Sequence, residues 1–381
     1  MGRSSVLLIY TGGTIGMKTD PVTGTLVPFD FNGIYDEFPS LRRLDVDLEV
    51  LPFEPIDSSN VAPELWVRLA DIIRENYERY DGFVVLHGTD TMSYSSSALS
   101  FMLENLGKPV VFTGSQIPIG VLRTDGRENL ITAIEIAAAK EEGRAIVPEV
   151  SLYFQNRLFR ANRTKKHSAE ELSAFASHNY PALADVGVGI HYRYGAICRC
   201  DAGKTFSVNT AVSQDVAVVK IFPGMTEPVF RAMLSAEGVR GVVLETYGAG
   251  NAPTFGWFIG ALEEAISRGV HVLNVTQCVS GSVNMDIYET GRRLQEAGVI
   301  SGRDITTEAA LAKMMCLLGR GCGTAEFVEL MRHSVRGEMT EEWGDRSGKW
   351  QDAPETAGTG SDRDNRCIFL EEKKFLYFGG F

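Results

Sequence analysis

The sequence predicts an α/β fold: a larger N-terminal domain with a parallel-rich sheet flanked by helices, and a smaller C-terminal α/β domain. Three observations lead to this prediction. Short apolar runs bounded by turn residues, typical of buried strands, alternate with longer segments that carry apolar residues at helical spacing. The alternation stops near residue 195 and resumes in shorter units near residue 216. A chain of 381 residues, 44% of them hydrophobic, is long enough for two domains with cores of their own.

The first half of the chain supplies most of the predicted elements. The apolar runs predicted to be buried strands are 6–10, 48–52, 82–86, 109–113 and 150–154, and the helical segments between them are 63–79, 93–106 and 127–140. In the first of these helical segments, Leu65, Leu69 and Ile72 recur at helical spacing. Because strands joined through helices in this order are parallel, we expect a parallel sheet with helices on both faces.

The second half repeats the pattern in shorter units. Strands are predicted at 216–221, 241–244 and 271–276, and helices through 229–236 and over 255–267. The sequence between the halves, YGAICRCDAGKTFSVNTAVSQD from Tyr194, has the character of turns and a linker. The predicted organisation is therefore an N-terminal domain at 1–194, a linker at 195–215 and a C-terminal domain at 216–342.

The end of the chain differs in composition. From Trp343 it reads WGDRSGKWQDAPETAGTGSDRDNRC, with few large apolar residues apart from two tryptophans. A segment of this kind can bury little apolar surface, so residues 343–381 are predicted to form a flexible tail.

Composition and charge exclude several classes of protein. A net charge of −12 argues against a nucleic-acid partner, because phosphate binding needs a concentrated basic patch. Segments of 18 apolar residues without charges are missing, and the apolar run after Ser5 is too short for a signal peptide. The six cysteines and six histidines lack metal-binding spacing. We therefore expect a cytoplasmic protein that contacts no membrane and holds no metal ion or cofactor.

Polar clusters follow four of the predicted strands. They are TGGT at 11–14, PIDSSN at 55–60, HGTDTM at 87–92 and GSQIP at 114–118. Each cluster alone is ordinary turn or helix-capping sequence. In open α/β sheets, however, ligands bind outside the carboxyl ends of the strands, and all four clusters are expected at that edge. The sequence therefore predicts a binding or catalytic site there.

The residue types in these clusters suit nucleophilic catalysis by a hydroxyl. A hydroxyl attacks a carbonyl when one group takes its proton and another stabilises the oxyanion. Gly12 and Gly13 would let the backbone approach a substrate closely. Thr89 offers a hydroxyl beside the Asp90 carboxylate, and a lysine in ANRTKKHS, residues 161–168, is a candidate base if its surroundings lower its pKa.

TGGTIG at 11–16, followed by HGTDTM at 87–92, resembles the bacterial-type L-asparaginases, specifically their cytoplasmic type I branch. Further segments with the same resemblance are TGSQIPIGVLRTDGRENL (113–130), YGAGNAP (247–253), TQCVSGSVNM (276–285) and GRDITTEAALAKM (302–314). The resemblance runs from residue 5 to about residue 342. The two threonine motifs, in this order and at this spacing, are highly specific for the family.

The resemblance implies hydrolysis of L-asparagine to L-aspartate and ammonia through an acyl-enzyme, in a homodimer or homotetramer. The catalytic residues that it implies are Thr14 as nucleophile and a second unit of Thr89, Asp90 and Lys166. The substrate-binding residues that it implies are Asp57, Ser58, Ser59, Thr89 and Asp90. Lys165 and Lys166 are adjacent, and the family's register after NRT, kept by AFAS from Ala174, favours Lys166. In this scheme Thr11 supports the turn.

Two departures from the family pattern stand out. The family has a tyrosine about ten residues after the nucleophile, where this chain has Thr25 and Leu26, and Tyr35 is a candidate replacement. Regulated type I enzymes resemble one another in an arginine before SYG, where this chain has Glu245. The resemblance then implies that such regulation is missing or different.

Several alternatives remain open. One is a catalytically silent binding protein on the same scaffold. Another is an enzyme with mainly glutaminase activity, because one methylene is worth only about 1–3 kcal/mol of discrimination. A nucleotide-binding module is poorly supported, because the motifs G-x-G-x-x-G and the P-loop are missing. A serine hydrolase is also poorly supported, because its motif G-x-S-x-G is missing. The asparaginase-like subunit of the tRNA-dependent amidotransferase carries an extra domain before its TGGT, whereas here that motif begins at Thr11.

Overall fold

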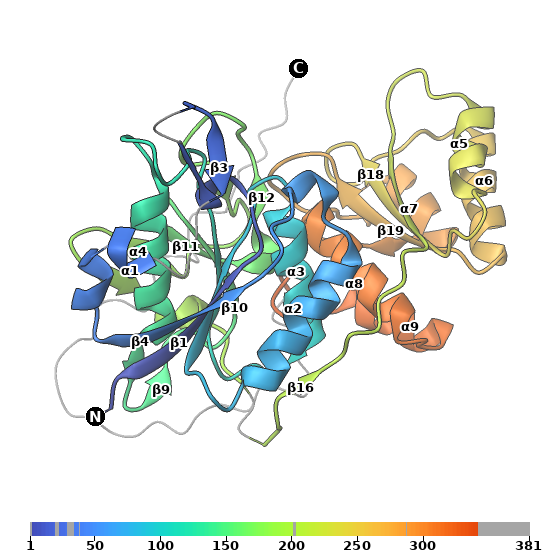
Figure 1. Cartoon of the computed structure of the whole chain (residues 1–381). Helices are drawn as coiled ribbons and strands as arrows, with labels where there is room; N and C mark the ends of the chain where they lie inside the picture. The colour runs from blue at the N-terminus through green and yellow to red at the C-terminus, as the bar shows by residue number, and fades with distance from the viewer. Residues whose placement is uncertain are drawn as a thin grey trace, which may run out of the picture. The chain divides into compact units, whose positions relative to one another are not determined.

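The structure is a computed structural model that describes residues 2–19, 23–28, 34–37, 39–200, 203–286 and 288–341 (Figure 1). The tail predicted at 343–381 lies outside the described residues. Among the residues described, no helix is long and apolar enough to cross a membrane.

The larger sheet has eight strands in the order β15-β14-β11-β10-β7-β5-β1-β4. Their bounds are β1 Ser4–Tyr10, β4 Val46–Pro52, β5 Gly82–Leu86, β7 Val110–Thr113, β10 Val150–Phe154, β11 Arg157–Arg160, β14 Ala184–Val186 and β15 Ile190–Tyr192. The five strands from β4 to β10 are parallel, and the remaining pairs are antiparallel. The prediction of a parallel-rich sheet is confirmed.

The order of the parallel strands sets the position of a binding crevice. Numbered along the chain, they lie in the order second, first, third, fourth and fifth, so that the direction of winding reverses between β1 and β5. Connections leave the sheet on opposite faces at such a switch point, and this opens a crevice beyond the carboxyl ends of the two strands. Two of the polar clusters identified in the sequence, 11–14 and 87–92, follow these two strands.

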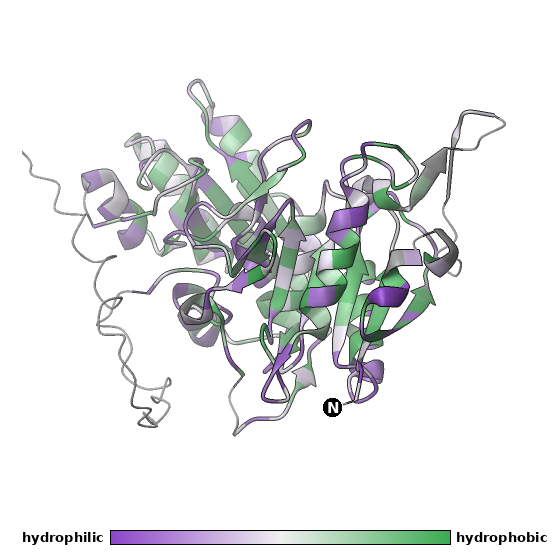
Figure 2. Cartoon of the chain, turned by 90° about the vertical axis from the view of Figure 1, so that its left-hand side faces the viewer, coloured by the Kyte–Doolittle hydropathy of each residue, from purple (hydrophilic) through white to green (hydrophobic). Residues whose placement is uncertain are grey.

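Helices cover both faces of the larger sheet (Figure 1). The helices α2 (Pro63–Asn76) and α3 (Met92–Met102) pack on the face that carries Leu7 and Ile9, and α4 (Gly126–Ala138) packs on the opposite face. Figure 2 shows the strands of this sheet largely coloured as hydrophobic, as expected when both faces are buried. Helices α2, α3 and α4 each end two to four residues before the end predicted from the sequence. In the case of α3, the chain leaves the helix to form the short strand β6 (Leu103–Glu104), which pairs with β16 (Ser207–Val208).

The smaller sheet forms the predicted C-terminal α/β domain. Its parallel strands lie in chain order and are β17 Val216–Lys220, β18 Gly241–Thr246, β19 His271–Thr276 and β20 Ile300–Ser301. The helices of this part are α5 Glu227–Leu234, α6 Gly256–Ser267, α7 Glu289–Glu296, α8 Thr307–Gly319 and α9 Thr324–Arg332. Residues of α5 and α6 bury one face of the sheet in a hydrophobic cluster of its own.

The other face of the smaller sheet shares a core with the N-terminal domain. Helix α8 packs on α3, and one hydrophobic cluster contains Leu99 and Met102 together with Met314 and Leu318. The segment predicted as a linker runs along both helices: the Asn209 amide donates to the Met102 carbonyl at 2.9 Å and the Ser213 amide to the Met315 carbonyl at 3.0 Å. The exact domain boundaries remain predictions.

Short elements complete the fold. They are α1 Ile34–Glu37 and the antiparallel pairs β2 Met17–Thr19 with β3 Leu26–Pro28, β8 Lys140–Glu141 with β9 Arg144–Ala145, and β12 Lys165–Lys166 with β13 Phe175–Ala176. The last pair holds the two adjacent lysines that the sequence offers as candidate bases.

Residues 334–340, here called the strap, fasten the two domains together. An ion pair of 2.6 Å joins Lys313 in α8 to Glu338 in the strap, and both side chains are fully buried. The Glu338 carboxylate also accepts hydrogen bonds from the backbone amides of residues 335 and 336. Arg163 reaches the strap from the N-terminal domain and donates to the Gly337 carbonyl at 2.7 Å. Attraction to Lys313, together with these hydrogen bonds, holds the pKa of Glu338 below its ordinary value although burial raises it.

This buried ion pair predicts a large loss of stability when one partner is removed. Lys313→Met should lower the free energy of unfolding by about 3–5 kcal/mol, because the Glu338 carboxylate would stay buried without its cation. Urea unfolding followed by circular dichroism measures this difference. Adding Glu338→Gln to Lys313→Met should recover part of the loss.

The matched control is Lys220→Met, which breaks a pair with Glu245 whose atoms are 3.7 Å apart and whose lysine is 64% exposed. Its cost should stay below about 1 kcal/mol. Equal costs for Lys313→Met and Lys220→Met would contradict the importance assigned to the buried pair.

Candidate active site

The two threonines of the TGGT turn have different surroundings. The backbone amide and the hydroxyl of Thr11 both donate to the Leu86 carbonyl, at 3.0 and 2.9 Å, and its carbonyl accepts from the Ile56 amide at 2.8 Å. Thr11 is only 2% exposed. Its hydroxyl is therefore committed to joining β1 to β5, and its carbonyl joins β1 to the loop after β4. Thr14 begins the short 3₁₀ turn Thr14–Gly16 and is partly exposed. Of the pair, Thr14 is therefore the threonine open to a ligand.

The glycines between these threonines allow close contact between turns. Gly12 and Gly13 have φ values of +119° and +88°, where side chains are strained. A Cβ on Gly12 would lie 2.3 Å from the Ile56 carbonyl oxygen, and one on Gly13 would lie 2.5 Å from the Cα of Gly88. Both positions therefore require glycine, because backbone lies directly against backbone.

The loop after β4 is held in the same way. The Asp57 carboxylate accepts from the amide and the hydroxyl of Ser59, at 2.8 and 2.7 Å, and caps the turn Ser58–Asn60. These hydrogen bonds, led by that from the hydroxyl, lower the pKa of Asp57. Ser58 is buried, and its carbonyl accepts from the Thr91 hydroxyl at 2.8 Å. Its own hydroxyl lies 3.5 Å from an Asp90 oxygen, so the loop meets the cluster that follows β5.

Thr89, Asp90 and Lys166 come together as the resemblance implies. The Lys166 ammonium donates to the Thr89 hydroxyl at 2.8 Å and to the Asp90 carboxylate at 2.7 Å. The lysine side chain is 18% exposed and the aspartate 64%, so the pair opens to solvent on the aspartate side. This arrangement offers a hydroxyl, a cation and an open carboxylate within hydrogen-bonding distance of one another.

The two adjacent lysines point in different directions. Successive residues of a strand face opposite sides, and β12 presents Lys166 to Thr89. The charge of Lys165 instead acts on Glu308, at the start of α8: burial raises the pKa of that carboxyl and Lys165 partly opposes the rise. Lys166 is therefore the lysine that lies with Thr89 and Asp90.

Sequence reasoning missed two residues that organise the cluster after β7. Asp125 is buried and accepts from the backbone amides of Gln116 and Ile117, both at 3.0 Å. The Gln116 side chain then reaches Thr89, whose hydroxyl donates to its amide oxygen at 3.2 Å. An aspartate just before a predicted helix is a recognisable signal for Asp125. Only the spatial arrangement identifies Gln116.

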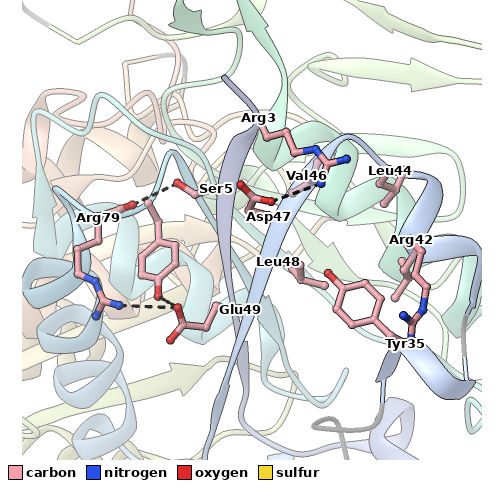
Figure 3. Close-up of a pocket in the computed structure, with 12 residues that line it drawn as sticks. Arg3, Ser5, Tyr35, Arg42, Leu44, Val46, Asp47, Leu48, Glu49 and Arg79 are labelled. Carbon is pink, nitrogen blue, oxygen red and sulfur yellow. Dashed lines mark hydrogen bonds and ion pairs between the residues drawn. The ribbon is translucent and has the colours of Figure 1, made fainter. Parts of the chain in front are cut away.

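Tyr35, the candidate replacement for the missing tyrosine, lies elsewhere. It belongs to α1 and lines a groove of about 700 Å³ beside β4, with Leu48 and the Arg42 guanidinium near its ring (Figure 3). The other tyrosine near the nucleophile turn is Tyr10, whose hydroxyl donates to the Gly16 carbonyl at 3.4 Å. Burial raises the pKa of Tyr10 to about 12, so this phenol supports the turn in its neutral form.

Glu245, which stands where regulated relatives have arginine, is engaged within the C-terminal domain. Its carboxylate accepts from the Thr307 hydroxyl at 2.6 Å and lies 3.7 Å from the Lys220 ammonium. The first contact joins the end of β18 to the start of α8, and the second joins β18 to β17. The expectation that arginine-dependent regulation is missing or different remains a prediction.

His87 lies fully buried beneath the site. Its Nδ1 lies 2.7 Å from the Gly88 carbonyl, which only accepts, so Nδ1 carries the proton. Its Nε2 is buried and has no hydrogen-bond partner among the described residues. Burial lowers the pKa of His87 to about 4, and the imidazole is therefore neutral near pH 7.

Two family profiles match the chain in succession. Residues 5–197 match the family described as Asparaginase, N-terminal, and residues 215–331 match the Glutaminase/Asparaginase C-terminal domain. L-asparaginase 1 of Escherichia coli K12 is 43% identical over 347 residues, which cover 89% of this chain and 99% of the relative. The human 60 kDa lysophospholipase is 41% identical over 358 residues, but only 61% of its length is covered.

Solved structures agree in fold. The crystal structure of L-asparaginase I from Vibrio cholerae has a TM-score of 0.81 and 41% identity, covering 89% of this chain and all of the other. The thermostable L-asparaginase from Thermococcus kodakarensis has a TM-score of 0.80 and 34% identity, with the same coverage.

The neutral, buried His87 predicts a pH-dependent contribution to stability. The unfolded chain takes up a proton on this imidazole near pH 6.5, whereas the folded protein resists it down to about pH 4. The contribution is therefore complete above pH 6.5 and falls by roughly 3 kcal/mol as the pH drops to 4. His87→Gln removes the titrating group, so the stability difference between wild type and variant should shrink as the pH falls. Urea unfolding at pH 7, 6, 5 and 4.5 measures it.

His191→Gln is the control, because His191 is exposed. Its effect should vary little over the same pH range. A difference between wild type and His87→Gln that stays constant from pH 7 to 4.5 would show that His87 does not titrate as argued.

Proposed function

Since the chain belongs to the asparaginase family, we propose that it hydrolyses L-asparagine to L-aspartate and ammonia through an acyl-enzyme on Thr14. The observation that carries the proposal is the Lys166 ammonium, which contacts Thr89 and Asp90 at the switch point of the sheet, next to the glycine turn that ends in Thr14. Relatives named L-asparaginase match nearly end to end, which supports the same substrate class here.

In the proposed reaction, the Thr14 hydroxyl oxygen attacks the side-chain amide carbon of asparagine. The hydroxyl proton passes to the leaving nitrogen, the carbon–nitrogen bond breaks and ammonia departs, leaving an ester on Thr14. Water then attacks the ester, and aspartate leaves as the hydroxyl is restored. Backbone amides freed by the open glycine turn are the donors that we assign to the oxyanion.

We assign proton handling to the unit of Thr89, Lys166 and Asp90. Lys166 is the base of this unit when it is neutral and accepts the Thr89 proton across their 2.8 Å contact. Asp90 holds the lysine in place at 2.7 Å and keeps a second oxygen for the substrate. We assign no tyrosine as the group that takes the proton from Thr14, because Tyr35 lies beside β4.

We assign recognition of the amino-acid end of the substrate to the loop after β4 and to Asp90. Asp57 and Asp90 are exposed carboxylates that suit the α-ammonium. The hydroxyls of Ser58 and Ser59, which point to Asp90 and Asp57 in the structure, would turn to donate to the α-carboxylate when substrate binds. Thr89 completes the set, since it lies with Asp90 around the Lys166 ammonium. A glutamine side chain is one methylene longer, so glutaminase activity remains a second candidate.

Other relatives have other names. The human relative is called a lysophospholipase, and a Pyrococcus abyssi relative, 32% identical, is called a subunit of glutamyl-tRNA(Gln) amidotransferase. This chain spans 61% of the first and 77% of the second, compared with 99% of the Escherichia coli asparaginase. Near end-to-end similarity to proteins named L-asparaginase supports the asparaginase assignment. A silent binding protein on the same scaffold is separated from it by the activity test below. The homodimer or homotetramer and the cytoplasmic location remain predictions.

Ammonia release tests the proposed reaction. The wild type should release ammonia from L-asparagine, and Thr14→Ala and Thr89→Val should each lower kcat by about a thousandfold or more, because each removes a hydroxyl used in the chemistry. Thr324→Ala, on the exposed start of α9, is the control and should keep wild-type activity. A folded wild type that releases no ammonia from asparagine or glutamine would leave a binding protein on this scaffold.

The adjacent lysines give a second test. Lys166→Met should lower kcat by about a hundredfold or more, the usual effect of removing a general base. Lys165→Met should stay within a few-fold of wild type, since its charge acts on Glu308 and not on Thr89. Steady-state kinetics with L-asparagine separates the two. The reverse ranking would move the base to Lys165.

A further inference from the structure

The Gln116 side chain lies between two separate parts of the site. Its amide oxygen accepts from the Thr89 hydroxyl at 3.2 Å. Its amide nitrogen donates to the backbone carbonyls of Ala169 and Glu171, both at 3.2 Å. These carbonyls belong to the loop 167–174 that joins β12 to β13, and we call this loop and its two strands the lysine hairpin.

The orientation of this amide is fixed by chemistry. A flipped amide would turn its oxygen toward two carbonyl oxygens, and all three atoms only accept hydrogen bonds. The nitrogen must therefore face the hairpin and the oxygen must face Thr89. The backbone of Gln116 is fixed too, because its amide donates to the buried Asp125 carboxylate at 3.0 Å.

The fixed oxygen determines where the Thr89 proton points. A threonine hydroxyl has one proton, and a lysine ammonium only donates. With Lys166 charged, the bonds must run from Lys166 to the Thr89 oxygen and from Thr89 to Gln116. In this charged, resting arrangement a lone pair of Thr89 faces Lys166 and the Thr89 proton points to Gln116. Once Lys166 is neutral, the hydroxyl must turn before it can donate to the lysine.

The hairpin that Gln116 holds also carries Lys166. The loop is ordered within itself: the His167 amide donates to the Ala174 carbonyl at 2.9 Å, and the Ser168 hydroxyl accepts from the amides of Glu170 and Glu171. The pairing of β12 with β13 sets the register of Lys166, and the buried Phe175 anchors that pair in the core. A hydrogen bond that holds the connecting loop adds to this support and helps to hold the Lys166 ammonium in place.

We propose that Gln116 is a positioning residue, which sets the direction of the Thr89 proton and fixes the distance between Thr89 and Lys166. This inference rests on the proposed function of the Thr89, Lys166 and Asp90 unit. The acceptor on Gln116 strengthens the bond from Lys166 to Thr89 by cooperativity, so it favours the charged form of the lysine. The resting site is thereby held in one arrangement of donors and acceptors.

The test compares Gln116→Met and Gln116→Glu with wild type in full-length protein. Gln116→Met keeps a side chain of similar size but removes the amide oxygen that accepts from Thr89 and the amide nitrogen that donates to the hairpin. Because small misplacements of catalytic groups are costly, kcat for L-asparagine should fall about tenfold or more. KM should stay within about threefold, since the assigned substrate-binding groups are untouched. Gln214→Met, whose amide reaches Glu64 on the surface, is the matched control and should match wild type.

The pH profile of kcat/KM distinguishes two roles for Gln116, which are setting the direction of the Thr89 proton and merely holding the lysine hairpin in place. In Gln116→Met the ascending limb should move to lower pH, because the Lys166 ammonium loses the cooperative support of its bond to Thr89. In Gln116→Glu, which puts a carboxylate beside the same hydroxyl, the limb should move to higher pH. Hydrogen exchange in the loop 167–174 should be faster than wild type in both variants, since both lose the amide donors.

Each result has one meaning. Opposite shifts of the limb with faster exchange support the inference. An active wild type with an unchanged limb in both variants overturns it, even if kcat falls, because support of the hairpin alone lowers activity equally at every pH. A folded wild type that releases no ammonia overturns the proposed function instead.

Discussion

Contact of backbone against backbone at the switch point between β1 and β5 is the constraint on which the site depends. Gly12 meets the loop after β4, and Gly13 meets Gly88 after β5, at distances that leave no room for a Cβ. Thr11 seals this junction with two hydrogen bonds to the Leu86 carbonyl. Because three turns are fixed together, Thr14 and Thr89 lie at neighbouring strand ends although they are far apart in sequence. The parallel sheet thus supplies the geometry, and the glycines allow its turns to approach.

A second network sets the position of the lysine. Lys166 comes from a short hairpin that Phe175 anchors in the core, and hydrogen bonds from its surroundings hold the rest of it. Gln116, from the N-terminal domain, holds the loop of the hairpin. Arg163, which precedes the hairpin in the sequence, pairs with Asp304 of the C-terminal domain at 2.9 Å. The site therefore depends on both domains, and the buried polar groups at their junction serve position as well as stability.

The sequence predicted the regular part of this fold well because buried parallel strands are short apolar runs that need no partner to be recognised. It missed the antiparallel strand β11, which follows β10 through Gln155 and Asn156, both with positive φ. Glycine is the usual sequence signal of such a two-residue turn, and this turn contains none. The cluster of Thr89, Asp90 and Lys166 was foreseen through the family resemblance. The role of Gln116 could not be predicted, because it depends on two backbone carbonyls that only folding brings near its side chain. Tyr35 is close to the nucleophile turn in sequence, but in the structure it lies beside β4 and not in the crevice.

The strap also has a consequence for how the protein is made. Ribosomes synthesise chains from the N-terminus, so the parallel sheet and the smaller sheet both emerge before residues 334–340 do. The Lys313 ammonium on α8 gains its ion pair with Glu338 only when the strap is made, and burying that ammonium before then would be costly. Helix α8 can form earlier, but the shared core gains its full set of contacts only after residues 334–340 have been synthesised. In the nascent chain, the joining of the two domains is therefore completed only once the strap has been made.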